Sequence, residues 1–302
     1  MRVNRFTFAT VLAVTAFTAA VAQAGTITGA TGPIRVDDKP VTVSAGTTVS
    51  LKKGQKVETL GATVTYRSDT GDLITLNSGS VAIEQETFDT GAAIFLSKGS
   101  ASGTLTEKTR IGASAGWIGA PKGGSAKVQI EPAGGLENSE ALFRTTDGEA
   151  WVQYFDFAVL LRKSQSVILD IDPAAHGTLC FRTGQQNPGD VEIRKATAAG
   201  VIYSYVPKAT IGCISDVENE NKTKICNDIN SLKTAKIHIK TQFGTKAPNE
   251  ADIGPGTCAQ IDNATGAIEV LFTSVKFEIL ERAISLTTEF ATLAQSNFSD
   301  VK

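Results

Sequence analysis

The sequence predicts a mainly β protein. An N-terminal β-solenoid or β-sandwich of short glycine-opened strands is followed by a disulfide-containing β-rich region with a C-terminal amphipathic helix. Three observations support this. Glycine, at 28 of 302 residues, repeatedly precedes short runs of alternating apolar residues. All four cysteines lie in the second half of the chain. The clearest helical spacing of apolar residues lies near the C-terminus.

The first 24 residues are typical of a secretory signal peptide. Arg2 and Arg5 supply a positive start, residues 6–21 are apolar and uncharged, and Ala22-Gln23-Ala24 offers small residues for cleavage. A transmembrane anchor is the alternative, but a span needs about 20 apolar residues and this stretch is shorter. The sequence therefore predicts a periplasmic or secreted protein with no membrane span after cleavage.

The composition excludes two classes of protein. An apolar share of 41% is enough for a sizeable core, which excludes a disordered chain. Lys and Arg, at 29, do not outnumber Asp and Glu, at 31, and Lys52-Lys53 and Arg162-Lys163 are isolated doublets. Because a basic surface is what holds a nucleic-acid backbone, we expect no nucleic acid among the partners.

Residues 25–172 form the first predicted domain, built from short strands. Apolar runs open roughly every 8 to 15 residues, at Gly46, Gly61, Gly71, Gly79, Gly91, Gly124 and Gly148 among others. Strands at this spacing are typical of a sandwich, a barrel or a β-solenoid. The spacing is irregular, which argues against a strict repeat protein.

Residues 173–302 form the second predicted domain, after a proline-containing segment at 172–177. Strands are expected at 178–182, 191–194, 201–206 and 235–240. Residues 216–230 are polar and rich in lysine and asparagine, which indicates a long surface excursion or a short helix.

The last expected element is an amphipathic helix over 274–294. Its apolar residues fall three or four apart, at Ile279, Ala283, Leu286, Phe290 and Leu293. Charged side chains take the other faces. This apolar face either packs on the protein's own sheet or binds a partner or a second copy.

The four cysteines are Cys180, Cys213, Cys226 and Cys258. An even number in an exported chain indicates two disulfides, for which three connectivities exist. We expect Cys213–Cys226 and Cys180–Cys258, since the first closes the polar excursion and the second ties the start of the region to its end. A zinc site is the alternative, but no Cys-x-x-Cys occurs and the chain has only two histidines.

One catalytic motif needs testing. Gly112-Ala113-Ser114-Ala115-Gly116 matches G-x-S-x-G, whose serine is a nucleophile on a strand-to-helix turn. The glycine-rich residues 117–124 that follow cannot form a helix, so Ser114 is expected to be an inert turn residue. A hydrolase built on it would have only His176 and His238 as possible bases.

Two aspartate pairs, Asp69 with Asp72 and Asp170 with Asp172, could offer oxygen ligands to calcium. Neither pair has the glycine and further acids of a dedicated calcium loop, so we expect solvated carboxylates. The sequence therefore predicts no catalytic, cofactor-binding or metal-binding residues, and no cofactor.

Several glycine-opened strand units within 42–171 resemble a known family. They are residues 79–83, 96–105, 109–113, 116–119, 148–152 and 159–167. In order and turn chemistry they are similar to FecR-like exported β-domains. The resemblance implies a module without catalysis, serving in the cell envelope or as the periplasmic part of a signal-transducing regulator.

These observations predict an exported, non-enzymatic structural or binding module of the cell envelope or extracellular space. Its partner would be an envelope or extracellular protein or a glycan. The alternative is a secreted hydrolase acting on polysaccharide or ester. An enzyme should show a pocket where acids, a histidine or an activated serine converge, and a scaffold should not.

Overall fold

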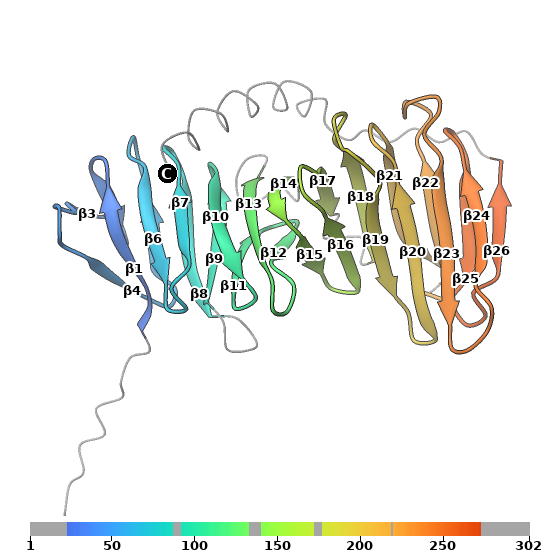
Figure 1. Ribbon diagram of the computed structural model, residues 1–302, viewed down its shortest axis with the longest axis horizontal. Coiled ribbons are helices and arrows are strands. Elements are labelled where there is room, and N and C mark those ends of the chain that lie inside the picture. The colour runs from blue at the N-terminus through green and yellow to red at the C-terminus, as the bar shows by residue number, and fades with distance from the viewer. Residues whose placement is uncertain (1–22, 87–91, 133–139, 172–176, 219, 273–302) are drawn as a thin grey trace, which may run out of the picture.

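The computed structural model describes residues 23–86, 92–132, 140–171, 177–218 and 220–272 (Figure 1). In this part of the chain every regular element is a strand, and no helix occurs that could cross a membrane. The prediction of a mainly β protein is therefore confirmed. The predicted helix over 274–294 and residues 1–22 of the predicted signal peptide lie outside the described residues, whereas the last two residues of that segment, Gln23 and Ala24, begin the strand Gln23–Ala30.

The described strands form two sheets of thirteen strands each. Sheet A runs, in spatial order, through β26 (Ile268–Leu271), β25 (Cys258–Asp262), β22 (Lys222–Asn227), β21 (Ile211–Val217), β18 (Thr178–Thr183), β17 (Ser166–Ile171), β14 (Glu140–Gly148), β13 (Ser125–Pro132), β10 (Ala101–Thr106), β7 (Leu73–Leu76), β6 (Val64–Ser68), β1 (Gln23–Ala30) and β4 (Val49–Lys52).

Sheet B runs through β24 (Asn249–Ile253), β23 (Ile237–Phe243), β20 (Gly200–Val206), β19 (Val191–Ala196), β16 (Phe157–Leu161), β15 (Ala150–Tyr154), β12 (Gly116–Gly119), β11 (Thr109–Ala113), β9 (Ala92–Lys98), β8 (Val81–Glu86), β5 (Lys56–Glu58), β2 (Ile34–Val36) and β3 (Lys39–Val41). Figure 1 shows the strands side by side in one long row, ordered from blue to orange along the chain.

From β13 onward the chain places one hairpin in sheet A and the next in sheet B. Each hairpin pairs with the previous hairpin of its own sheet, as β14 pairs with β17 and β16 with β19. The two sheets therefore extend together along one axis. Two facing sheets are the feature of the predicted sandwich, and the stepwise addition of hairpins along one axis is the feature of the predicted solenoid. β17 and β18, on either side of the predicted domain boundary, are antiparallel neighbours in sheet A.

One apolar core lies between the sheets. Side chains alternate along each strand, so that in β18 Leu179, Phe181 and Thr183 are buried while their neighbours are half-buried. Tyr66, Phe143 and Phe181 are the largest fully buried side chains. Each contributes about 1.5–3 kcal/mol by leaving water.

Glycine opens so many strands because the chain changes sheets through tight turns. In five of these crossovers the third turn residue is a glycine with a positive φ; these glycines are Gly46 (79°), Gly54 (82°), Gly79 (78°), Gly123 (71°) and Gly256 (78°). A type II turn requires this conformation at its third position, and glycine adopts it without a steric penalty. Many of the strand-opening glycines of the sequence therefore lie in crossovers, while Gly71 lies in the β6–β7 hairpin turn.

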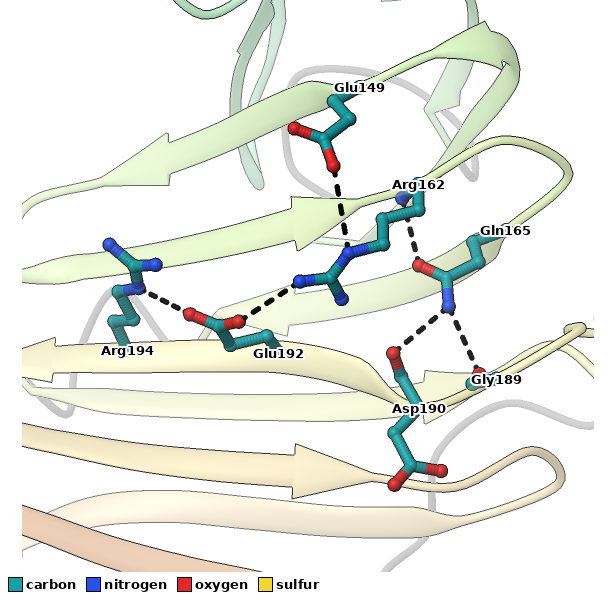
Figure 2. Close-up of polar contacts among 7 residues, drawn as sticks. All are labelled: Glu149, Arg162, Gln165, Gly189, Asp190, Glu192 and Arg194. Atoms are coloured by element: carbon teal, nitrogen blue, oxygen red, sulfur yellow. Dashed lines mark hydrogen bonds and ion pairs between the residues drawn. The ribbon is translucent and has the colours of Figure 1, made fainter.

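Buried polar side chains tie neighbouring crossovers together. The Gln165 amide nitrogen donates to the carbonyls of Gly189 (3.0 Å) and Asp190 (2.9 Å), as Figure 2 shows. Asn187 donates to the Ser166 carbonyl and accepts from the Ser166 amide, both at 2.9 Å. These bonds satisfy backbone groups where the sheet ladders end, which a buried crossover requires.

The disulfides join Cys180 to Cys213 and Cys226 to Cys258. Two disulfides are as expected, but the expected pairings were wrong. The four cysteines form one row across β18, β21, β22 and β25, in which each faces the next in register. Cys213 therefore had two candidate partners, Cys180 and Cys226.

Backbone geometry decides between these two partners. In antiparallel sheets, opposite residues alternate between wide hydrogen-bonded pairs and narrow pairs without backbone hydrogen bonds, in which side chains are closer. Asp228 N donates to Ile211 O at 2.8 Å, and this pair lies two positions from Cys213 and Cys226. The Ile211–Asp228 pair is therefore a wide one. Because wide and narrow pairs alternate along the strands, Cys213 and Cys226 are a wide pair as well.

Both observed disulfides occupy narrow pairs. Asp216 N donates to Gly177 O at 3.1 Å, so these two residues are a wide pair. The first disulfide lies three positions away, and an odd number of positions leads from a wide pair to a narrow one. Asn227 N donates to Thr257 O (2.9 Å), one position from the second. In each disulfide the two Cα atoms are 4.0 Å apart. Sheet register, and not distance along the chain, sets the connectivity.

The polar segment over 216–230 is neither a long excursion nor a helix. Its described residues form the end of β21, the turn after it, the whole of β22 and the start of the β22–β23 crossover. The Lys222 ammonium pairs with the Glu218 carboxylate at 2.9 Å across this turn. The four strands expected elsewhere in this region are confirmed as β18, β19, β20 and β23. Glu218, Glu220 and Asn221 of the turn are exposed, whereas four of the six residues of β22 are buried, so the polar composition reflects an exposed turn.

Candidate functional site

The residues of the hydrolase hypothesis do not meet. Ser114 lies in the two-residue turn between β11 and β12, where Ala113 pairs with Gly116. A strand follows it, which confirms the predicted turn and leaves the nucleophile motif without its helix. His238 is on β23, five strand spacings or about 24 Å from β12 across sheet B. His176 lies outside the described residues.

Of the aspartates considered for calcium, Asp69 is exposed in the β6–β7 turn and Asp72 has structural contacts. Asp72 Oδ2 accepts hydrogen bonds from the backbone (3.0 Å) and hydroxyl (2.8 Å) of Thr106, which ties the start of β7 to the end of β10. Asp170 faces Cys180 in register, and Asp172 is not among the described residues. Within the described ranges, no three His, Cys, Asp or Glu side chains gather as a metal site.

The outer face of sheet B carries a different kind of cluster. Aromatic side chains occupy the outward positions of five of its strands; they are Phe95, Trp117, Trp151, Tyr203, Tyr205 and His238. We call this set the aromatic face. Both tryptophans of the chain belong to it. It extends from β9 to β23, which is seven strand spacings or about 34 Å.

A glycine lets the first tryptophan of this face pack against the sheet backbone. Phe95, Gly112 and Trp117 are register partners on β9, β11 and β12. A Cβ atom on Gly112 would lie 2.4 Å from the Trp117 ring, so the indole rests directly on the backbone of β11. The Phe95 and Trp117 ring centroids are 5.8 Å apart. Both rings remain partly exposed.

An arginine lies at the centre of the face. The Arg194 guanidinium is 4.5 Å from the Trp151 ring centroid and 5.3 Å from that of Tyr203. Its Nε donates to Glu192 Oε1 at 2.6 Å. Cation–π contacts and this hydrogen bond hold Arg194 in one orientation between the two rings.

Ion pairs extend from this arginine toward the crossovers. The other Glu192 oxygen accepts from Arg162 Nη2 at 3.3 Å, and Arg162 Nε lies 3.6 Å from Glu149 Oε1. Figure 2 shows Arg162 between the two glutamates, with Arg194 on the far side of Glu192. The Glu192 side chain is 7% exposed. Positive and negative side chains therefore alternate along this row, from Arg194 through Glu192 and Arg162 to Glu149.

The far end of the face is also ordered by polar contacts. The Tyr205 and His238 rings stack with centroids 5.9 Å apart. His238 Nδ1 lies 2.8 Å from Asp252 Oδ1, and Lys240 Nζ lies 3.4 Å from Glu250 Oε1. The face therefore presents half-exposed rings at fixed positions, bordered by hydrogen-bonding groups of both charges.

Sequence reasoning did not find this face. The alternation that turns Trp151 and Arg194 outward can be read within each strand. Which strands become neighbours cannot, because Trp117 and Trp151 are brought together by the β12–β15 pairing across the β13–β14 hairpin. No family model, no curated protein and no solved structure matches this chain.

Proposed function

We propose that the protein is an exported, non-enzymatic module that binds a glycan chain along the aromatic face. The observation that carries this proposal is the placement of both tryptophans, with Tyr203 and Tyr205, on one face of sheet B about 34 Å long. Aromatic rings have negative faces, which attract the weakly positive C–H groups of a sugar ring. The FecR-like resemblance of 42–171 supports the same class of role.

The charges on this face favour a glycan over a nucleic acid. Glu149, Glu192, Glu250 and Asp252 pair with the cations that border the rings, so the face carries no excess of positive charge to hold a phosphate backbone. Carboxylates, guanidinium groups and the exposed Gln153 amide can all exchange hydrogen bonds with sugar hydroxyls. A long surface also suits an extended chain more than a compact ligand.

Intrinsic fluorescence tests the proposal directly, because both emitting tryptophans lie on the face. The full chain is titrated with cellohexaose, chitohexaose and soluble glycan strands of peptidoglycan. We expect one of these to shift or quench the emission, and Trp151→Ala to weaken its binding by about tenfold or more, as truncation of a central aromatic anchor does. Phe155→Ala is the matched control, since Phe155 is 87% exposed at the β15–β16 turn.

Two results would overturn the proposal. One is an unchanged emission with all three glycans while calorimetry also shows no heat. The other is binding that Trp151→Ala and Trp117→Ala leave intact, which would place the glycan elsewhere. Thermal unfolding of each variant shows whether it is folded before binding is compared.

Two disulfides indicate an oxidising, extracytoplasmic compartment. We propose that the chain reaches it through cleavage after Ala24. The remaining strand starts at Gly25, which pairs with Leu51 on β4 and Ser68 on β6. The intact mass of protein recovered from outside the cytoplasm should correspond to a chain starting at Gly25, and a mass that retains residues 1–24 would contradict this.

A further inference from the structure

A cavity of about 400 Å³ opens where three crossovers meet, away from the aromatic face. Arg182 on β18 and Ile211 on β21 contribute to it. They are register partners, and their side chains project from the outer face of sheet A. Residues of the β18–β19, β20–β21 and β22–β23 crossovers complete the lining. Its volume lies in the range of small-ligand sites.

The cavity is positively charged. Arg182 and Lys208 both line it, and none of the described lining residues is an aspartate or glutamate. In the described part of the chain, neither cation takes part in an ion pair. Two uncompensated cations in a concave site concentrate anions.

The other side chains add specificity. Gln185, Gln186 and Asn230 bring three amides, each of which can donate and accept hydrogen bonds. Ile211 and Leu232 supply an apolar wall, and Leu232 is 46% exposed. This combination matches a ligand that carries a negative group, several hydroxyls and a C–H face.

The walls are held in place before any ligand arrives. Ala209 N donates to Gly184 O at 3.4 Å, and Leu232 N donates to Ala209 O at 3.0 Å, which links all three crossovers. Ala209 has a φ of 54°, a left-handed conformation that costs a non-glycine residue energy. The surrounding structure therefore fixes this turn, and the cavity is preorganised.

We infer that this cavity binds an acidic sugar residue, with Arg182 and Lys208 on its carboxylate and the three amides on its hydroxyls. The acidic character follows from the cavity alone. The saccharide class rests on the proposed function. The protein would thus hold an acidic glycan at two separate places, the aromatic face of sheet B and this cavity on the side of sheet A.

The test uses the full chain and tri-galacturonic acid as the probe, measured by calorimetry. Its methyl ester is the neutral matched ligand. Because a hydrogen bond to a charged group is worth more than a neutral one, we expect Arg182→Gln and Lys208→Gln to weaken binding about 10- to 100-fold. The ester should bind as weakly. Lys233→Gln is the control, since Lys233 is an exposed lysine of the same region outside the lining.

Several outcomes would overturn the inference. These are no binding of tri-galacturonic acid, equal binding of its ester, or Arg182→Gln and Lys208→Gln variants that bind as the wild type does. Equal or tighter binding of tri-glutamate would show that the cavity binds an acidic peptide and not an acidic saccharide. Tryptophan emission separates the two sites: Trp151→Ala should leave this carboxylate-dependent binding intact even if the aromatic face binds no glycan. Arg182→Lys keeps the charge and shows whether a loss in Arg182→Gln comes from charge or misfolding.

Discussion

Lys195 and Asp216 form an ion pair between the two sheets, with Lys195 Nζ 3.0 Å from Asp216 Oδ1. Lys195 belongs to β19 of sheet B and Asp216 to β21 of sheet A. Asp156, in the β15–β16 turn, completes the cluster at 2.6 Å from the same nitrogen. The Lys195 and Asp216 side chains are 4% and 11% exposed, and burial raises the pKa of Asp216.

Replacement of the lysine should leave a buried carboxylate without its counter-charge. We expect Lys195→Met to lower the free energy of unfolding by about 3–5 kcal/mol at pH 7. The folded-state pKa of Asp216 is already raised, so protonation removes the unpaired charge and the deficit should shrink at pH 4. Chemical denaturation at both pH values measures this.

Two variants control this experiment. Asp216→Asn in the Lys195→Met background should recover part of the loss. Lys163→Met, which breaks an exposed pair with Asp147, should hardly change the midpoint. An equal deficit at pH 4 and pH 7 would contradict the charge explanation.

Asp262 should make the β25–β26 hairpin sensitive to acid. Its Oδ1 accepts from the amide (2.7 Å) and hydroxyl (2.8 Å) of Thr265 and from the Ala264 amide (3.1 Å). The hydrogen bonds from Thr265 hold the pKa of Asp262 below its ordinary value of 3.8. Since the folded-state pKa is depressed, this stabilisation is fully present above the unfolded-state pKa of 3.8. It is lost as the pH falls through the folded-state pKa.

A thermal midpoint measured between pH 5 and pH 2 checks this prediction. The wild type should lose more stability over the acid range than Asp262→Asn, which keeps an acceptor oxygen and does not titrate. Parallel curves for the two proteins would show that Asp262 contributes nothing to the acid transition.

The disulfide pairing predicts a specific result for a cysteine variant. Cys213→Ser should leave one free thiol, at Cys180, and keep the Cys226–Cys258 bond. The lost bond closes a separation of 33 residues, so chain entropy alone predicts a cost of about 3–4 kcal/mol. Peptide mapping without reduction measures the pairing, and a peptide that links Cys213 to Cys226 in the wild type would rule it out.

Ser164 offers a stabilising substitution. It is the third residue of the β16–β17 crossover turn, where Gln165 N donates to Arg162 O at 2.9 Å, and its φ is 63°. Five other crossovers place glycine at this position, because an L-residue pays about 1–2 kcal/mol in this conformation. Part of that gain is offset by the greater backbone entropy of glycine in the unfolded chain.

Ser164→Gly should therefore raise the free energy of unfolding by about 0.5–1 kcal/mol. Ser164→Ala is the control and should bring no such gain, since alanine keeps the steric penalty. Chemical denaturation compares the three proteins. A Ser164→Gly variant that is no more stable than Ser164→Ala would argue against backbone strain at this turn.

The sequence by itself determined the local structure of this protein. Strands follow from alternation, and glycines mark several of the crossovers because only a residue without Cβ takes a left-handed turn at no cost. It also indicated that the four cysteines would form two disulfides. All of these properties depend on a few consecutive residues or on composition.

Tertiary structure alone decided what the strands bring together. Cys213 meets both Cys180 and Cys226, and only the alternation of wide and narrow pairs in the sheet selects Cys180. Trp117 and Trp151 share a face because β12 pairs with β15. The cavity gathers Arg182, Lys208 and Asn230 from three crossovers. Pairing between strands distant in sequence depends on the whole register of a sheet, which no local pattern encodes.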